Sequence, residues 1–233
     1  MPELVKIPLA NAEYVARFAR PCIALIGVDR PRAFEAVVTA LLPFQFRLAN
    51  AQLVDTGTPG DYKTILNLPD RGISFQFGAE EYKFTKEGSS WATVNEDAQV
   101  LLAAEGALME VGGNPTPMTS VSVANAAKVE SCMVTLAMHI QLLNKPREEV
   151  LAPFIPEPFK KIAEQRKAQR YGNHLVLADG DVLLDFSRGF ANGIFLRLDT
   201  RFEGHPPLMD MLAKVRSDEE AVFKILDIEE ETP

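Results

Sequence analysis

The chain has 233 residues, of which 47% are hydrophobic and 24% are charged, and its formal net charge is -8. This composition is typical of a globular protein and provides enough apolar material for one large domain or two small ones. A negative field repels phosphate backbones and anionic lipid head groups, so we expect neither nucleic acid nor a membrane surface as a partner.

Cysteine usage and the N-terminal segment favour a reducing compartment. The two cysteines, Cys22 and Cys132, lie far apart in the sequence, each within an apolar run. A disulfide framework would need more cysteines, and a free cysteine in such a run behaves as a small buried hydrophobe. The longest apolar run near the N-terminus, residues 22–28, is too short for a signal-peptide core or a membrane span. We therefore expect a cytoplasmic protein.

The first elements of the chain are predicted from local patterns. Residues 11–20 could form a short helix, and residues 22–28 are a β-prone run. Asp29 is a helix N-cap residue, and Pro31 suits the first turn of a helix. The helix that follows carries apolar residues at helical spacing, namely Phe34, Val37, Val38, Leu41 and Leu42.

Three strands and a second helix are predicted next. The strands cover residues 44–54, 62–68 and 73–84, with Gly78 as a bulge in the third. Thr93 and Glu96 fit a capping box, in which the side chain of each residue accepts a hydrogen bond from the backbone amide of the other. The helix that they begin stops at residues 112–113, and its apolar residues are Val100, Leu101, Ala104, Leu108 and Val111.

The rest of the chain repeats this order of strands and helices. Asp179 and Gly180 give the strongest hairpin signal in the sequence. The predicted elements are strands 119–126 and 128–143, a helix ending near residue 171, strands 174–177, 182–186 and 194–199, helices 206–215 and 217–226, and a frayed acidic end.

Strands that follow one another with flanking helices predict an α+β fold. We expect a largely antiparallel, curved sheet with helices packed on one face. A weak likeness between residues 68–75 and 177–184 suggests two related halves, residues 1–113 and 114–233. The alternatives are a true duplication, packed tightly as two pseudo-repeats, and one compact domain in which this order arises by chance.

The sequence lacks the common motifs of cofactor and metal chemistry. It contains no Rossmann or P-loop pattern, no HExxH, no GxSxG and no CxxC pair. Three scattered histidines without ligand spacing do not make a metal site. We therefore expect no cofactor and no bound metal.

Histidines are the first candidates for a site. Strand geometry places His139 with Thr135 and Gln141, on the face opposite Met138, so it could line a cleft or simply face solvent. His205 precedes a helix, where a ligand could bind, and a structural role is the alternative. His174, at the start of a strand, allows the same two interpretations.

Charged side chains form two further groups. The carboxylates Asp179, Asp181, Asp185 and Asp199 could support acid–base or metal chemistry, but salt pairing with Arg188, Arg197 and Arg201 explains them with fewer assumptions. Basic residues between positions 160 and 170 could bind a phosphate or an acidic partner. They could equally offset the dipole at the end of a helix.

Methionines suggest a binding groove. They could line an adaptable apolar groove for a peptide or a lipid-like ligand, with core filling as the alternative. The methionines concerned are Met118, Met133, Met138, Met209 and Met211.

These patterns favour a non-catalytic binding or assembly protein over an enzyme. It would use a sheet face, a sheet edge or an apolar groove, and it could form a homodimer. The expected partner is a protein, including a second copy of the chain, or a small apolar ligand. The candidate ligand-binding residues are His139, Met133, Met138, His205 and Arg197. The alternative is a hydrolase or isomerase whose site is assembled from distant residues around His139 or His205.

Overall fold

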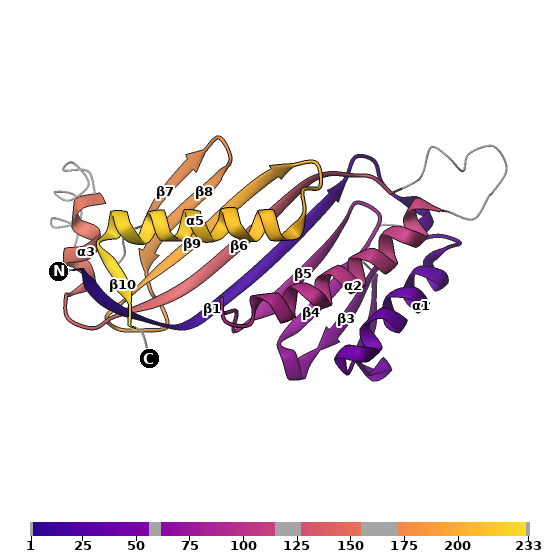
Figure 1. Ribbon diagram of the computed structural model, residues 1–233, viewed down its shortest axis with the longest axis horizontal. Coiled ribbons are helices and arrows are strands. Elements are labelled where there is room, and N and C mark those ends of the chain that lie inside the picture. Colours follow the sequence, from indigo (N-terminus) through magenta and orange to yellow (C-terminus); the bar gives the residue numbers. More distant parts are fainter. Residues whose placement is uncertain (1, 56–61, 115–126, 155–171, 232–233) are drawn as a thin grey trace. The chain divides into compact units, whose positions relative to one another are not determined.

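The computed structural model describes residues 2–55, 62–114, 127–154 and 172–231 (Figure 1). The helices are α1 (Arg30–Leu41), α2 (Val94–Gly113), α3 (Arg147–Leu151) and α5 (Leu208–Leu226). The strands are β1 (Glu3–Phe18), β2 (Ala51–Asp55), β3 (Tyr62–Leu68), β4 (Ile73–Phe77), β5 (Glu81–Glu87), β6 (Val129–Leu142), β7 (Gly172–Leu177), β8 (Gly180–Phe186), β9 (Gly193–Glu203) and β10 (Ile228–Glu230).

Within the described residues, the strands form one 10-stranded sheet. Its order is β2-β3-β4-β5-β1-β6-β9-β8-β7, and β10 pairs with β1. The β2–β3, β3–β4, β4–β5, β7–β8 and β8–β9 pairs are antiparallel, whereas β10 runs parallel to β1. The predicted α+β fold with a large antiparallel sheet is therefore confirmed.

The contacts of the chain group into two compact units. Unit 1 comprises residues 1–11, 134–201 and 207–233, and unit 2 comprises residues 12–133 and 202–206. Both units are therefore built from segments that are distant in the sequence.

Unit 2 has a core between its strands and the helices α1 and α2, which lie side by side (Figure 1). Burial alternates along β4, where Ile73, Phe75 and Phe77 are buried and the residues between them are half-exposed. Alternation follows from the strand repeat of two residues, which sends neighbouring side chains to opposite faces. Each fully buried side chain of this size contributes about 1.5–3 kcal/mol. The Phe75 ring contacts those of Phe77 and Tyr82.

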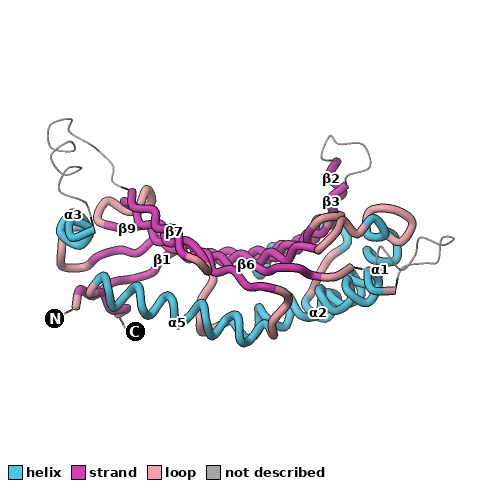
Figure 2. The backbone as a smooth tube through the Cα atoms, turned by 90° about the horizontal axis from the view of Figure 1, so that it is seen from above, coloured by secondary structure: helices cyan, strands magenta, loops and turns pink. Residues whose placement is uncertain are grey.

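Unit 1 has its core between α5 and the strands β6, β8 and β9. Along β9, Ile194, Leu196 and Leu198 are buried. α5 lies on one side of β7 and β9 (Figure 2). It buries residues at helical spacing, including Leu208, Met211, Val215 and Leu226. A continuous stripe of buried residues along one face stabilises one long helix.

Most strands and helices with a regular pattern were predicted correctly. The structure confirms the helix that begins after Asp29, the strand of residues 62–68, the helix ending at 112–113 and the long strand within 128–143. The predicted hairpin is present, but its turn is formed by residues 178–179, one residue earlier than the predicted Asp179–Gly180, and Gly180 begins β8. The alternation along 194–199 is confirmed.

Two predictions near the N-terminus were wrong. Of the residues 11–20 predicted as a helix, 11–18 form the second half of β1, and the buried Tyr14, Ala16 and Phe18 lie at a two-residue spacing. Sheet pairing therefore overrides a local helix preference. Residues 22–28 form a short 3-10 helix and turns, in which Cys22 and Leu25 are buried and Ile23 is exposed.

Other predictions failed at element ends. Residues 44–50 contain 3-10 turns, so β2 begins at Ala51, and Gly78 lies in the hairpin turn between β4 and β5 instead of a bulge. Thr93 does precede α2, but its hydroxyl contacts Ser90 and Asp97, so no capping box forms.

The C-terminal segment also differs from the prediction. The two predicted helices are the single helix α5, because its buried stripe continues past Ser217. The acidic end was predicted to fray over residues 229–233, but Glu229 and Glu230 pair with β1 as part of β10. The strand predicted at 119–126, the helix predicted before residue 171 and the basic residues between 160 and 170 lie outside the described residues.

Among the helices that the structure describes, none has the length and apolar character needed to cross a membrane.

Candidate functional site

An apolar groove of about 610 Å³ lies in unit 1 between the β7–β8 hairpin and α5. Leu175 and Leu177 of β7 face it, together with Val182 of β8, which is the register partner of Leu175. Val222 and Ile225 of α5 form the opposite wall. The alternation of β7 sends Leu175 and Leu177 to the same face, so the hairpin itself shapes the groove.

The outer side of β7 is an open sheet edge. β7 stands at the end of the strand order, and among the described residues only β8 pairs with it. Residues 178–179 form a two-residue turn, so Leu177 and Gly180 are a hydrogen-bonded pair, as is every second pair from there. The backbone N–H and C=O groups of His174 and Val176 therefore point away from β8, towards the open edge.

Apolar side chains are exposed around this edge. The exposed fractions are 58% for Leu175, 66% for Val176, 41% for Leu177 and 67% for Ile225. Edge strands of monomeric proteins are usually protected by Lys, Pro or a bulge, and β7 contains none of these. Exposed apolar side chains therefore lie on both faces of β7 and on the neighbouring part of α5.

A charged cluster closes one end of the groove. The Lys214 ammonium lies 2.6 Å from the Asp218 carboxylate and 3.3 Å from the Asp179 carboxylate. Its hydrogen bond to Asp218 raises the pKa of Lys214, and Asp179 adds to the effect. This cluster therefore stays paired at neutral pH.

Gly180 lies directly against the backbone of β9. A Cβ atom at this position would lie 1.9 Å from the Asp199 carbonyl oxygen, so no other residue fits. Gly180, one residue of the predicted hairpin signal, is thus required for the packing of β8 against β9.

His139 was correctly placed on the face of β6 opposite Met138. Its Nδ1 lies 2.8 Å from the Ser187 hydroxyl, which accepts hydrogen bonds from the amides of Gly189 and Phe190 at 3.1 and 3.2 Å. With its lone pairs occupied, the hydroxyl donates to Nδ1, so the neutral ring carries its proton on Nε2. Ser187 is buried, so this pair secures the loop after β8 and does not form an accessible nucleophile.

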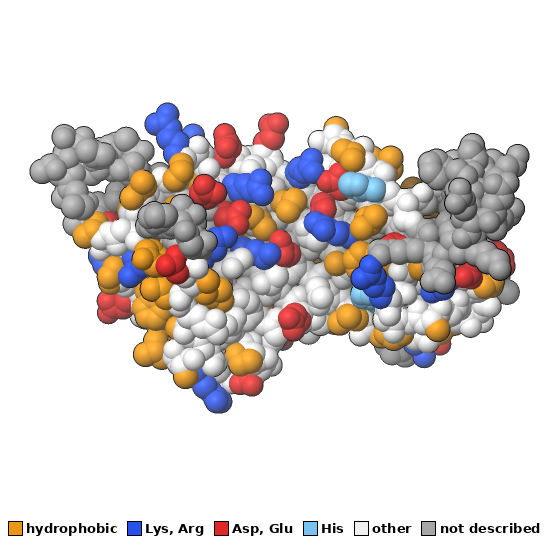
Figure 3. All heavy atoms as spheres, turned by 180° about the vertical axis from the view of Figure 1, so that it is seen from behind, with side chains coloured by type: hydrophobic (Ala, Val, Ile, Leu, Met, Phe, Trp, Pro, Cys, Tyr) orange, Lys and Arg blue, Asp and Glu red, His pale blue; other side chains and the backbone are white. Residues whose placement is uncertain are grey.

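Arg197 takes part in the salt pairing that the sequence predicted. It lies 3.0 Å from the Asp199 carboxylate, and the Asp199 carboxylate also accepts a hydrogen bond from Thr135. Arg201 pairs with Asp181 at 2.5 Å. Figure 3, which views the strands from the side away from α5, shows acidic and basic side chains intermingled. Pairing leaves these carboxylates poorly suited to bind a metal.

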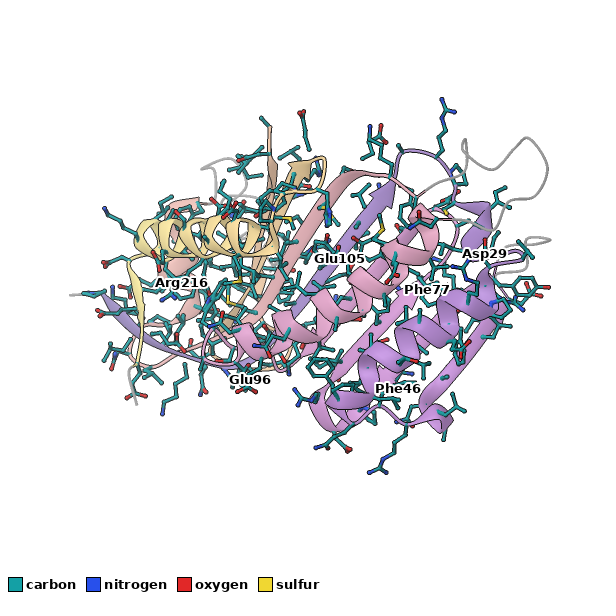
Figure 4. All side chains as sticks on the ribbon, turned by 45° about the vertical axis from the view of Figure 1, so that its right-hand side comes forward. Asp29, Phe46, Phe77, Glu96, Glu105 and Arg216 are labelled. Atoms are coloured by element: carbon teal, nitrogen blue, oxygen red, sulfur yellow. The ribbon has the colours of Figure 1, made fainter. Side chains whose placement is uncertain are left out.

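His205 belongs to a buried polar cluster in unit 2. Its Nε2 lies 2.8 Å from Glu105 Oε1, which also accepts hydrogen bonds from the Tyr14 hydroxyl at 3.2 Å and from the Tyr82 hydroxyl. Glu105 projects from α2 and is 6% exposed (Figure 4). The Cys132 thiol lies 3.3 Å from the Tyr14 hydroxyl.

In this cluster the Glu105 carboxylate is surrounded by hydrogen-bond donors. Burial raises the pKa of both Tyr14 and Tyr82 well above the usual range, and the nearby Glu105 raises them further. Both phenols therefore keep their protons and donate to Glu105. Five segments that are distant in the sequence meet here, and the resulting network can specify how they pack.

The predicted methionine groove does not coincide with the groove in unit 1. Met138 and Met211 are each 1% exposed and belong to the core, whereas Met133 is half-buried and Met209 is exposed. None of these four lines the groove. Met118 lies outside the described residues.

The groove residues themselves were not predicted from the sequence as a site. Leu175, Leu177 and Ile225 look like core positions of a strand and a helix. That β7 is an edge strand depends on sheet order, which no local pattern encodes.

Among the described residues, no group of three or more His, Cys, Asp or Glu side chains is arranged to hold a metal ion. No protein-family model matches the chain, and no match is found among curated proteins either.

Proposed function

We propose that this chain is a non-catalytic binding or assembly protein of the cytoplasm. It binds an extended protein segment with apolar side chains at alternate positions. The segment adds as a strand to the open edge of β7 and places its apolar side chains into the groove against α5. Neither a nucleic acid nor a membrane is part of this function, in keeping with the net charge of -8.

The observation that carries this proposal is the coincidence of an apolar groove with a strand edge that pairs with no other described strand. Main-chain hydrogen bonds to an edge strand give affinity, and pockets for alternate side chains give specificity. Here the edge provides the backbone groups of His174 and Val176, while Leu175 and Leu177 line the groove. Each apolar side chain of a bound segment that becomes buried adds roughly 1.5–3 kcal/mol before the cost of ordering the segment.

The experiment uses two fluorescein-labelled peptides of the same composition, measured by fluorescence anisotropy. One alternates leucine and threonine, and the other has the leucines in one block. We expect the alternating peptide to bind more tightly. Leu175→Asp should weaken its binding at least tenfold, because a carboxylate would then be buried in the groove. Leu48→Asp is the matched control, since Leu48 is an exposed leucine of unit 2.

Equal binding of both peptides, or an equal effect of the two substitutions, would contradict strand addition at β7. Val176→Pro distinguishes the contribution of the strand edge from that of the groove, because it removes an outward N–H group without breaking a bond to β8. The proposal requires this substitution to weaken binding although it leaves the groove side chains unchanged.

We also propose the finer architecture that the sequence suggests. In it, all helices cover one face of a curved sheet, and residues 1–113 and 114–233 are related α+β halves. In support, the similar segments 68–75 and 177–184 each join antiparallel neighbours, β3–β4 and β7–β8. A crystal structure whose two halves do not superpose on each other would contradict the duplication.

A second candidate function, hydrolase or isomerase chemistry, is favoured by one observation. His205 lies 2.8 Å from the carboxylate of Glu105, as general acid–base catalysis would require. A panel of ester, amide and isomerase substrates tests it. Turnover that is lost in His205→Ala but kept in His174→Ala would support an enzyme, and no turnover by the unmodified protein would count against it.

A further inference from the structure

We propose that the segment bound at β7 is β7 of a second copy of the same chain, so that the protein forms a homodimer with a continuous sheet. This inference rests on the proposed function, because it names the partner of the same edge and groove. β7 has the required pattern itself, since Leu175 and Leu177 alternate with His174 and Val176.

The backbone of β7 limits the registers open to such a dimer. The outward N–H and C=O groups belong to Gly172, His174 and Val176, and in the register that we propose His174 and Val176 form the hydrogen-bonded pairs across the interface. With antiparallel strands related by a twofold axis, His174 of one copy lies opposite Val176 of the other. Leu175 then lies on the axis opposite its own counterpart, in a non-hydrogen-bonded pair.

This register extends the groove across the axis. Leu175 faces the groove, so the central pair of leucines lies on the same side of the sheet as α5. Leu177 of each copy lies opposite Asn173 of the other, also on the groove side. The exposed Ile225 of α5 stands at the open wall of the groove and would be covered by the second copy.

Exposed apolar side chains stand at the centre of the proposed interface. Leu175, Val176, Leu177 and Ile225 are between 41% and 67% exposed. A stable interface buries about 800 Å² on each partner, of which the apolar centre is one part and the polar rim another. The remaining backbone and side chains of β7 and α5 supply the rim.

A twofold contact between two β7 strands also gives a closed assembly of two chains. The other sheet edge, β2, exposes Leu53 and Val54. If β7 paired with β2 of the next copy, a free edge would remain at each end of the assembly, which would keep growing unless it closed into a ring. Pairing of β7 with itself uses the same edge twice and stops at two chains.

Site-specific cross-linking of the full chain tests the register. Facing residues of a non-hydrogen-bonded pair have Cβ atoms about 4.5–5.5 Å apart, close to disulfide geometry. With a mild oxidant, Leu175→Cys should therefore give a covalent dimer, and Leu48→Cys, an equally exposed position in unit 2, should not. The native Cys22 and Cys132 are buried and do not compete.

Light scattering after size exclusion gives the second readout. We expect twice the mass of one chain for the unmodified protein and a monomer for Val176→Pro. A monomeric unmodified protein, or equal cross-linking of both cysteine variants, would overturn the dimer. Larger, concentration-dependent species would indicate β7–β2 pairing and would overturn it as well.

A labelled peptide of residues 172–178 separates the two proposals. If the unmodified protein is monomeric but the alternating leucine–threonine peptide binds at β7, strand addition stands and the second copy is wrong as its partner. If that peptide and the peptide of residues 172–178 both fail to bind a monomeric protein, the proposed function fails too.

Discussion

The buried cluster around Glu105 allows one quantitative prediction about stability. Glu105→Ala would remove the acceptor of two phenolic hydroxyls, of which Tyr82 is fully buried and Tyr14 is 4% exposed. Leaving a buried donor unsatisfied costs about 1–3 kcal/mol. The Tyr14 hydroxyl keeps the Cys132 thiol as a neighbour and therefore loses less.

Two further terms enter this estimate. The loss of one buried methylene group adds about 0.8 kcal/mol. Relief from burying the carboxylate offsets part of the total. We therefore expect Glu105→Ala to lower the free energy of unfolding by about 2–5 kcal/mol.

Urea unfolding followed by circular dichroism measures this change. Glu110→Ala is the matched control, because Glu110 is an exposed glutamate of the same helix, and it should change the stability by less than about 0.5 kcal/mol. Tyr82→Phe combined with Glu105→Met should cost less than the sum of the single changes, since both partners of the bond are then apolar. Equal effects of the two glutamate substitutions would refute the structural role of the cluster.

Three other predictions concern single sites. Burial raises the pKa of Glu3, but hydrogen bonds from the backbone amides after β6 lower it more, so the net pKa is lowered. The ionised Glu3 therefore stabilises the fold at pH values above its pKa in the unfolded chain, and this stabilisation is lost as the pH falls through its pKa in the folded protein. Glu3→Gln should flatten the acid limb of the pH–stability curve. Burial raises the pKa of the Cys22 and Cys132 thiols, so both should react with a thiol reagent only after unfolding, and fast labelling of the native protein would contradict this. Gly180→Ala should destabilise the protein by several kcal/mol in urea unfolding, because the added Cβ overlaps the β9 backbone; a change below about 0.5 kcal/mol would contradict that contact.

Prediction from the sequence succeeded where burial alone determines the pattern. The alternation along Ile194, Leu196 and Leu198 and the helical spacing from Val100 to Val111 reflect one buried face each. It failed for residues 11–20, where pairing with distant strands decides the structure. A local pattern carries no information about such partners.

The candidate sites show the same limit. The opposite faces of His139 and Met138 and the pairing of Arg197 with Asp199 follow from the strand repeat and from neighbouring charges. The contact between His205 and Glu105 joins residues 100 positions apart, and nothing in the sequence connects them. The open edge of β7 likewise depends on which strand ends the sheet.

Amide hydrogen exchange at the edge of β7 tests the account most directly. The outward amides of His174 and Val176 should exchange more slowly as the protein is concentrated or as the alternating peptide is added. The amides of Leu175 and Leu177, which bond to β8, should already be protected in the dilute protein. Exchange at His174 and Val176 that stays equally fast at every concentration of protein and peptide would contradict strand addition at this edge.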